Sequence, residues 1–385
     1  MNSKISNDKK LKLTAVIFSV FFTGLLILLL AAGIIEPDKE YSESENRKLA
    51  SFPELSVSRI ADGRFMTDFE EYMSDRFFGR NTLVSVKAYF SRLLGETEIN
   101  DVYIGRNGRL YEVPSDFQKD RVEKTVNAIK EFSISCNIQN RYFMLIPNAT
   151  EIIPEDLPLL LRCEGQAEQI EDIYSGLDTF VDTVDAVSAL SEYENREELY
   201  FRTDHHWTSK GALTAFRAFS NKLQLEEYEN GYKEITVSNS FSGTLSSSSG
   251  ISDSLDTLEV ILPEGIDGTY YIRNAGTLNK SSSVLDISKL ESKNQYEVFF
   301  GGNFSRLELY TANLNERNLL IFKDSYANCF IPFLIPHFEK IVVIDPRYFT
   351  EDINDILKDT EFTHLLYLYN VNTFLEDTVL SDCID

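Results

Sequence analysis

Short apolar runs alternate with segments of helical periodicity along most of the chain, and this alternation restricts the possible folds more than any other feature. The runs have the length and composition of buried strands and comprise residues 142–146, 180–184, 199–202, 319–322, 341–344 and 365–369. Helical patterns lie at residues 122–132, 166–177, 209–223, 325–335 and 352–358. Strands that alternate with helices across short connections predict an α/β fold with a mostly parallel sheet flanked by helices.

Residues 230–315 differ from the rest of the chain because helical periodicity fades there. Short alternating runs at residues 269–272, 298–300 and 307–310 predict a β-rich insertion, and the serines between residues 242 and 249 predict a loop. Two interpretations stay open for this insertion: an elaboration of the fold, or a lid or polysaccharide-binding surface.

Residues 13–35 contain no formally charged side chain and are rich in Leu, Ile and Phe. As a helix they would extend roughly 34 Å, enough to cross a bilayer. Lysines precede the segment, so the positive-inside rule predicts a cytoplasmic N-terminus at residues 1–12 and a transmembrane anchor at residues 13–35. A tether would follow at residues 36–50, and a single extracytoplasmic domain at residues 51–385. Cleavage of a signal peptide near Ala31 is the alternative, although the apolar run is long for one.

The formal net charge of the chain is −24, and a surface this acidic repels the phosphates of nucleic acids. We therefore exclude DNA and RNA as partners. The four cysteines, Cys136, Cys163, Cys329 and Cys383, match no CxxC metal or redox spacing. We expect free and mostly buried thiols, because a chain of this length can bury a sufficient core without disulfides.

Residues 203–207, Thr-Asp-His-His-Trp, hold two of the chain's four histidines and its only tryptophan. They follow an apolar run, and ligands of parallel α/β sheets bind where strands end. In an extended backbone Asp204 and His206 would point the same way and His205 would point away. A carboxylate beside an imidazole is the pairing that general-base catalysis needs. We therefore predict His206 as the base, Asp204 as its orienting partner and His205 as a residue on the substrate side.

The nucleophile of such a site is expected where another strand ends. Ser325 follows the run at residues 319–322 and opens a helical pattern, which is the position of the nucleophile in many hydrolases. Backbone N–H groups at the start of that helix would face a developing oxyanion. Serine is also a common helix cap, so the joint arrangement of Asp204, His206 and Ser325 indicates a triad more strongly than the serine alone.

Three further residues are candidates for binding substrate. Arg347 follows the run at residues 341–344 and could orient an anionic or polyhydroxylated group. Trp207 could stack on the face of a sugar, or it could pack in the core. Asn148 follows the run at residues 142–146 and is a candidate oxyanion donor, with an ordinary loop residue as the alternative.

The sequence Thr203–Thr208, followed by Gly211-Ala212, resembles the DHHW family, which is named for this motif, and the related alginate O-acetylation proteins. The resemblance spans about residues 45–375. Its other matches are Glu45-Asn46-Arg47 with Phe52-Pro53, Asp75-Arg76-Phe77 with Arg80, Tyr103-Ile104-Gly105 with Gly108-Arg109-Leu110-Tyr111, Lys323-Asp324-Ser325-Tyr326, and Asp345-Pro346-Arg347-Tyr348.

The resemblance implies an SGNH-hydrolase-like fold in a permuted order, in which the Asp-x-His motif precedes the serine. By matching motifs it implies a triad of Asp204, His206 and Ser325. The implied activity is that of a membrane-anchored, extracytoplasmic O-acetyltransferase that acetylates a polysaccharide through an acyl-serine, with the acetyl group supplied by a membrane-bound O-acyltransferase. The serine motif is Lys-Asp-Ser where SGNH enzymes commonly have Gly-Asp-Ser, so the oxyanion hole is not assigned by the resemblance.

Three alternatives stay open. A carbohydrate acetylesterase would use the same triad with water as the acceptor. Asp204, His205 and His206 could instead bind a metal, but only His337 and His364 remain as further histidines, and we expect neither a metal nor a cofactor. A non-catalytic polysaccharide-assembly protein could also be built on the same scaffold, because fold does not determine function.

Overall fold

A computed structural model describes residues 13–28, 41–42, 47–77, 79–159, 161 and 165–384, which form two compact units, Met1–Leu94 and Gly95–Asp385. The first unit contains a helix at residues 13–28, the paired strands β1 (Tyr41–Ser42) and β2 (Arg47–Lys48), and the helices α2 (Val57–Ala61), α3 (Arg64–Asp75) and α4 (Arg80–Leu93). No helix among the described residues has both the length and the apolar character needed to cross a bilayer. Residues 29–35 of the expected anchor lie outside the described part of the chain.

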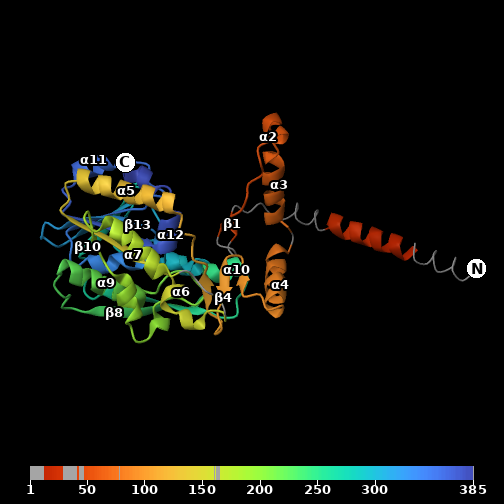
Figure 1. Ribbon diagram of the computed structural model, residues 1–385, viewed down its shortest axis with the longest axis horizontal. Coiled ribbons are helices and arrows are strands. Elements are labelled where there is room, and N and C mark those ends of the chain that lie inside the picture. Colours follow the sequence, from red (N-terminus) through yellow and green to blue (C-terminus); the bar gives the residue numbers. More distant parts are fainter. Residues whose placement is uncertain are drawn as a thin grey trace, which may run out of the picture. The chain divides into compact units, whose positions relative to one another are not determined.

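The second unit is built on an eight-stranded sheet, shown in yellow to blue in Figure 1. Its order is β11 (Lys280–Ser281), β10 (Tyr270–Asn274), β12 (Arg306–Thr311), β14 (Lys340–Ile344), β13 (Asn318–Lys323), β15 (His364–Asn370), β6 (Asn140–Ile146) and β7 (Asp182–Thr183). The strands from β14 to β7 are parallel, and β12, β10 and β11 extend them in antiparallel pairing. The predicted α/β fold with a mostly parallel sheet is therefore confirmed.

Both faces of this sheet are covered, which explains why its parallel strands are continuous apolar runs. Along β6, Tyr142 and Met144 point into one core while Phe143 and Leu145 point into the other. The first core is closed by α6 (Ala149–Ile152), α8 (Ala186–Ser191) and α9 (Ser209–Leu223). The second is closed by α5 (Lys119–Ser135), α7 (Gln166–Leu177), α11 (Ile353–Asp359), α12 (Val371–Glu376) and α13 (Leu380–Ile384).

The region at residues 230–315 contributes strands in two different places, as predicted for the runs at residues 269–272 and 307–310. The run at residues 298–300 is not a strand: Val298 ends the 3₁₀-helix η4 (Gln295–Val298), and Phe299 makes only an isolated bridge with Leu285. The strands β8 (Tyr232–Phe241) and β9 (Asp256–Pro263) form a separate antiparallel pair, whereas β10, β11 and β12 join the main sheet. The serine-rich stretch between β8 and β9 was expected to be a loop, and this expectation is wrong. It forms the short helix α10 (Thr244–Ser249), in which Ser247 and Ser249 donate hydrogen bonds to the carbonyls of the preceding turn.

Two other local expectations are wrong. Residues 199–202 are not a strand of the sheet, and their only bridge pairs Tyr200 with Trp207. The carbonyls of Tyr200 and Phe201 instead accept from the buried guanidinium of Arg109, at 3.1 Å and 2.9 Å. Those of Leu199 and Arg202 accept from the backbone N–H groups of Thr208 and Leu110. The helix expected at residues 325–335 is two 3₁₀-helices, η5 (Ser325–Cys329) and η6 (Ile331–Leu334), because Pro332 lacks the N–H that a continuous helix would need.

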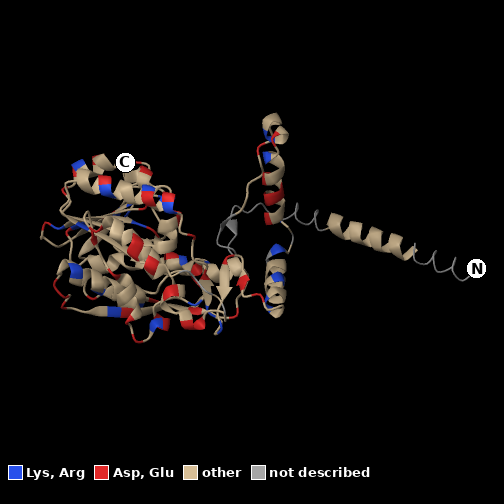
Figure 2. Ribbon diagram, in the orientation of Figure 1, with Lys and Arg blue, Asp and Glu red and all other residues tan. Residues whose placement is uncertain are grey.

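A third small sheet lies in the same unit. It is formed by β3 (Glu98–Ile99), β4 (Val102–Ile104) and β5 (Leu110–Glu112), which pair in antiparallel order. Acidic side chains outnumber basic ones in the chain, 61 to 37, and they are spread over the elements of this unit (Figure 2).

Candidate active site

The polar residues expected to cluster lie where the central parallel strands end. β13 ends at Lys323 and leads directly into Asp324 and Ser325, and Asn370 is the last residue of the neighbouring β15. The loop that carries Asp204 and His206 meets this edge from outside the sheet. The edge rule for parallel sheets thus predicted the place correctly, although residues 199–206 reach it as a loop and not as a strand.

Asp324 fixes the backbone on which Ser325 sits. One of its carboxylate oxygens accepts from the N–H of Tyr326 at 2.9 Å and the other from the N–H of Asn370 at 2.9 Å. This carboxylate therefore caps η5 and joins it to β15, and it leaves the half-buried Ser325 at the sharp turn between strand and helix.

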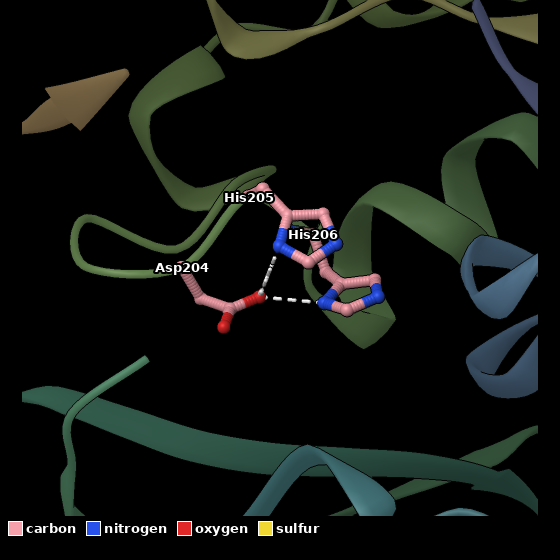
Figure 3. Close-up of side chains that lie close together, drawn as sticks. All are labelled: Asp204, His205 and His206. Atoms are coloured by element: carbon pink, nitrogen blue, oxygen red, sulfur yellow. Dashed lines mark hydrogen bonds and ion pairs between the residues drawn. The ribbon is translucent and has the colours of Figure 1, made fainter. Parts of the chain in front are cut away.

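His206 connects the serine to a carboxylate. Its Nε2 lies 2.8 Å from Oγ of Ser325, and its Nδ1 lies 2.6 Å from Oδ1 of Asp204. Figure 3 shows that both imidazoles turn Nδ1 toward Asp204, at 2.6 Å for His206 and 3.8 Å for His205. The three residues Asp204, His206 and Ser325 thus form one continuous hydrogen-bonded chain.

Asp204 is buried and fully engaged. Its Oδ1 also accepts from the backbone N–H of His206 at 2.9 Å, and its Oδ2 accepts from the N–H of Thr244 at 2.8 Å and from the Thr244 hydroxyl at 3.1 Å. Burial by itself would raise the pKa of this carboxyl, but the two imidazoles and the hydrogen bonds outweigh it and hold the pKa below its ordinary value. The carboxylate therefore stays ionised beside His206.

Gly243 makes room for this carboxylate. A Cβ atom at Gly243 would lie 2.2 Å from Cβ of Asp204, and the Gly243 N–H donates to the Thr203 hydroxyl at 3.0 Å. The hydroxyl of Thr203 in turn donates to Asp256 at 2.6 Å, and the same carboxylate accepts from the Thr203 N–H at 2.8 Å. The start of α10 and the loop of Asp204 are thereby held together at van der Waals distance.

Aromatic rings hold the base in place. The ring of Tyr296 stacks on His206 with centroids 3.8 Å apart, and the His205 ring lies 3.9 Å away at a tilted angle. Burial and the neighbouring His206 ring lower the pKa of His205, against the opposing effects of Asp204 and Glu112. The Thr244 hydroxyl lies 2.5 Å from Nδ1 of His205.

Two of the expected substrate contacts are not available in the expected form. Trp207 is completely buried, and its Nε1–H donates to the Tyr326 carbonyl at 2.8 Å, so the indole packs in the core and cannot stack on a sugar. Arg347 is bound to Asp345 through Nε at 2.8 Å and Nη2 at 2.7 Å, and it keeps 36% of its side chain exposed. Asp345 also pairs with the buried Lys323 at 3.2 Å, so one carboxylate is shared between two cations.

Asn148 belongs to a buried amide network. Its side-chain N–H donates to Glu112 at 2.7 Å, and its carbonyl oxygen accepts from Asn370 at 2.6 Å. Asn372 donates to the same Glu112 carboxyl at 3.0 Å. Burial raises the pKa of Glu112 against the opposing effects of His205 and the two amides. Among the described residues, the hydrogen bonds of Asn148 run to this network and not to Ser325.

The group Asp204, His205 and His206 also has the composition of a metal site, with ligand atoms within 4.8 Å of one another. The distances argue against this use. Two ligands of a tetrahedral zinc are roughly 3.4 Å apart, since each lies about 2.0–2.1 Å from the ion. The 2.6 Å between Nδ1 of His206 and Oδ1 of Asp204 is instead a hydrogen-bond distance.

Several residues of this site were not identified from the sequence. They are Gly243 and Thr244, which hold Asp204, Tyr296, which stacks on His206, and Asp256 and Arg109, which hold the loop. All lie far from the motif in the chain, and no local pattern marks them. Of these residues only Arg109 lies in a motif shared with the family, and that match did not indicate what Arg109 does.

The fold and the site together define a mixed α/β protein with a large, mostly parallel sheet and a Ser-His-Asp hydrogen-bonded chain at the end of its central strands. Within that class the chain belongs to the DHHW protein family, whose model matches residues 115–344. No curated protein matched the chain.

Two solved structures share the fold, and a third is more distantly similar. The crystal structure of a DHHW family protein from Eubacterium siraeum DSM 15702 is 27% identical, with a TM-score of 0.62 over 74% of this chain and 95% of that one. Bacillus cereus PatB1 with a sulfonyl adduct is 19% identical, with a TM-score of 0.59 over 72% and 95%. The O-acetyltransferase domain of Pseudomonas putida AlgJ is more distant, at 12% identity and a TM-score of 0.48 over 73% and 94%.

Proposed function

We propose that this protein is a membrane-anchored, extracytoplasmic O-acetyltransferase that acetylates a polysaccharide through an acetyl-Ser325 intermediate. The observation that carries the proposal is the hydrogen-bonded chain from Ser325 through His206, at 2.8 Å, to Asp204, at 2.6 Å. Membership of the DHHW family and the motifs shared with alginate O-acetylation proteins support acyl transfer as the use of this chain.

In the first half of the reaction, Oγ of Ser325 attacks the carbonyl carbon of an acetyl donor while its proton passes to Nε2 of His206. The ionised Asp204 accepts from Nδ1 and stabilises the imidazolium that forms. Collapse of the tetrahedral intermediate breaks the bond to the leaving group, which takes the proton from Nε2. Acetyl-Ser325 and a neutral imidazole remain.

In the second half, a sugar hydroxyl gives its proton to Nε2 and attacks the acetyl carbon, and Ser325 regains the proton as it leaves. Water can replace the sugar in this step, because Ser325 and His205 are both partly open to solvent. An acetylesterase with the same three residues is therefore the second candidate function. The two differ only in which hydroxyl reaches the acyl-serine first.

The oxyanion of both tetrahedral intermediates needs at least one donor near Ser325. Asp324 already accepts from the N–H of Tyr326 through its side chain, and its carbonyl accepts from the N–H of Ala327 at 3.3 Å. Of the backbone N–H groups in this turn, that of Ser325 is the first that does not donate to Asp324. We assign it as an oxyanion donor; Asn148 is held by Glu112 and Asn370.

The location and the partners follow from the N-terminal sequence and the family resemblance. An uncharged segment at residues 13–35 preceded by lysines supports an anchor with the large unit outside the cytoplasmic membrane. An acetyl donor made in the cytoplasm must then cross the membrane, so we assign its delivery to a membrane-bound O-acyltransferase. The acceptor is a cell-surface or secreted polysaccharide.

Trapping with a sulfonyl fluoride tests the nucleophile, and a sulfonyl adduct is recorded for the fold relative PatB1. The full-length protein in detergent should gain one sulfonyl group on Ser325, located by peptide mass spectrometry. His206→Ala should slow labelling at least 100-fold, because the hydroxyl loses its base. Ser288→Ala, at an exposed serine whose hydroxyl bonds Asp286 and no residue of the triad, is the matched control and should label like the wild type. Labelling of another residue, or equal labelling of His206→Ala, would overturn the proposal.

Transfer and hydrolysis are separated by supplying 4-nitrophenyl acetate with and without an oligosaccharide. An acetylated oligosaccharide that requires Ser325 supports transfer. Release of acetate that is unaffected by the oligosaccharide supports the esterase instead.

A further inference from the structure

A cavity of about 920 Å³ lies beside the hydrogen-bonded chain, within the unit Gly95–Asp385. It shares a wall with the site, because His205 and Thr244 both line it. These are the residues whose side chains contact the His206 ring and the Asp204 carboxylate. Its volume is that of a pocket for a few sugar units and not for a single acetyl group. The cavity is therefore the natural place for the acceptor.

Most of the ionisable side chains that line this cavity are acidic. Five carboxyl side chains line it: Asp101, Asp116 and Glu376 are exposed, whereas Glu112 and Asp377 are more enclosed, and burial raises the pKa of both. Arg347 is the one arginine or lysine among the lining residues, and Asp345 behind it holds its guanidinium through two hydrogen bonds.

Two further groups beside the cavity, Lys323 and His205, also bear on its net charge. The neighbouring Lys323 is buried and donates to Asn303, Asn328 and the same Asp345, so this one carboxylate is shared by two cations and the three charged groups together carry one positive charge. Burial lowers the pKa of His205, which disfavours its charged form. A ligand in the cavity thus faces five carboxyl groups against one net positive charge from Arg347, Lys323 and Asp345.

The other lining side chains suit hydroxyl groups. Asn100, Ser115, Thr244, Ser248, Asn372 and Thr373 offer amide and hydroxyl groups, and the lining residues include the His205 imidazole but no Phe, Tyr or Trp. Recognition in this cavity therefore depends on hydrogen bonds and charge, without the stacking that Phe, Tyr or Trp side chains would supply.

We propose, on the basis of the function assigned above, that this acidic cavity binds the acceptor glycan and selects one without carboxylates near the reacting hydroxyl. The acceptor class is a neutral or amine-bearing hexose or hexosamine polymer, and polyuronates are rejected. Carboxylates of a uronate chain would enter a site whose fixed charges have the same sign, in which water is partly displaced and repulsion is screened less than at an open surface.

Binding to the inactive full-length Ser325→Ala protein tests this selection without requiring catalysis. The two ligands are a β-1,4-glucose hexamer and the same hexamer oxidised at C6 to glucuronate, so that linkage and length are matched. We expect the neutral hexamer to bind at least about tenfold more tightly at low salt, and the difference to shrink at 0.5 M salt. Binding of neither hexamer, equal binding, or tighter binding of the oxidised hexamer would overturn the proposal.

Charge-reversal variants assign the selection to this cavity. Asp116→Lys with Glu376→Lys changes two exposed lining residues and should raise the affinity for the oxidised hexamer relative to the neutral one. Glu131→Lys with Glu171→Lys makes the same change of net charge on exposed positions of α5 and α7, outside the cavity, and should leave the ratio as in the starting protein. An equal effect of both pairs would mean that bulk charge, and not this cavity, sets the ratio.

Catalytic assays on the protein with Ser325 distinguish failure of this proposal from failure of the proposed function. If Ser325 is not trapped by the sulfonyl fluoride, the proposed function fails, whatever the hexamers show. If Ser325 is trapped but both hexamers bind alike, only the charge selection fails.

Discussion

Gly243→Ala is expected to disable the site while the fold persists. The added Cβ would lie 2.2 Å from Cβ and 2.6 Å from Cα of Asp204, so the closest contact must widen by about 1.2 Å to reach an ordinary 3.4 Å. The atoms that must move belong to the backbone and the first side-chain carbon, and the carboxylate moves with them. Its 2.6 Å bond to His206 cannot survive a shift of that size.

The magnitude of the effect follows from that displacement. A misplacement of about 1 Å costs roughly 10²-fold in rate, and complete loss of the orienting carboxylate costs about 10⁴-fold in a serine protease. We therefore expect kcat for 4-nitrophenyl acetate to fall between these limits. Overpacking of this kind costs about 1–3 kcal/mol of stability, which lowers the melting temperature by only a few degrees. The variant is thus folded at 25 °C and inactive there.

The control is another glycine with room for a methyl group. In Gly176→Ala the Cβ meets Val126 at an ordinary 3.5 Å inside α7, and this change should keep full activity and add roughly 0.5–1 kcal/mol of stability. Kinetics and thermal scans of both variants check the reasoning. If Gly243→Ala retained activity within threefold of the wild type, either the close approach or the role of Asp204 would be wrong.

Three further changes have defined outcomes. Asp204→Asn should lower kcat roughly 10³–10⁴-fold with little change in KM, and a loss below tenfold would contradict its assigned role. Burial lowers the pKa of His337 to about 4 in the folded protein, whereas the unfolded value is about 6.5, so the unfolded state binds more protons between these pH values and stability falls as the pH falls through them. His337→Phe removes that titration, and its melting temperature should decline less than that of the wild type between pH 6.5 and pH 4.5; equal declines would show that His337 does not contribute. Trp207→Phe should lower the melting temperature, because the bond to Tyr326 is lost, and leave KM for an oligosaccharide unchanged; a raised KM at unchanged stability would place the indole in the binding site.

Strands and helices with strong periodicity were predictable from the sequence alone. The apolar runs that became β6, β13, β14 and β15 are buried on both faces, so their composition carries the signal whatever surrounds them. The helix α9 begins and ends where its pattern predicted, and the Thr208 hydroxyl accepts from the N–H of Gly211 at 3.2 Å as an N-cap.

The loop of residues 199–206 shows where such reasoning stops. Its apolar side chains are buried like those of a strand, but the carbonyls of Tyr200 and Phe201 find a guanidinium from a residue about 90 positions earlier instead of a neighbouring strand. Local periodicity reports burial and not the identity of the hydrogen-bond partner. The expectation that Asp204 and His206 point the same way by alternation was therefore based on the wrong backbone. Their pairing arises instead from a turn, in which Oδ1 of Asp204 accepts from both the N–H and the ring of His206.

The meeting of His206 with Ser325 depends on residues on either side of the pair. The Trp207 indole donates to the Tyr326 carbonyl at 2.8 Å, and the Tyr326 hydroxyl donates to the carbonyl of His205. His205 and Trp207, the two neighbours of the base, are therefore both hydrogen-bonded to Tyr326, the residue after the serine. These two bonds lie on either side of the bond between His206 and Ser325. A shift of either motif by one residue would break these two bonds together with the bond between His206 and Ser325. This explains why a tryptophan that never meets solvent stands next to the base, since it sets the register in which the two motifs face each other.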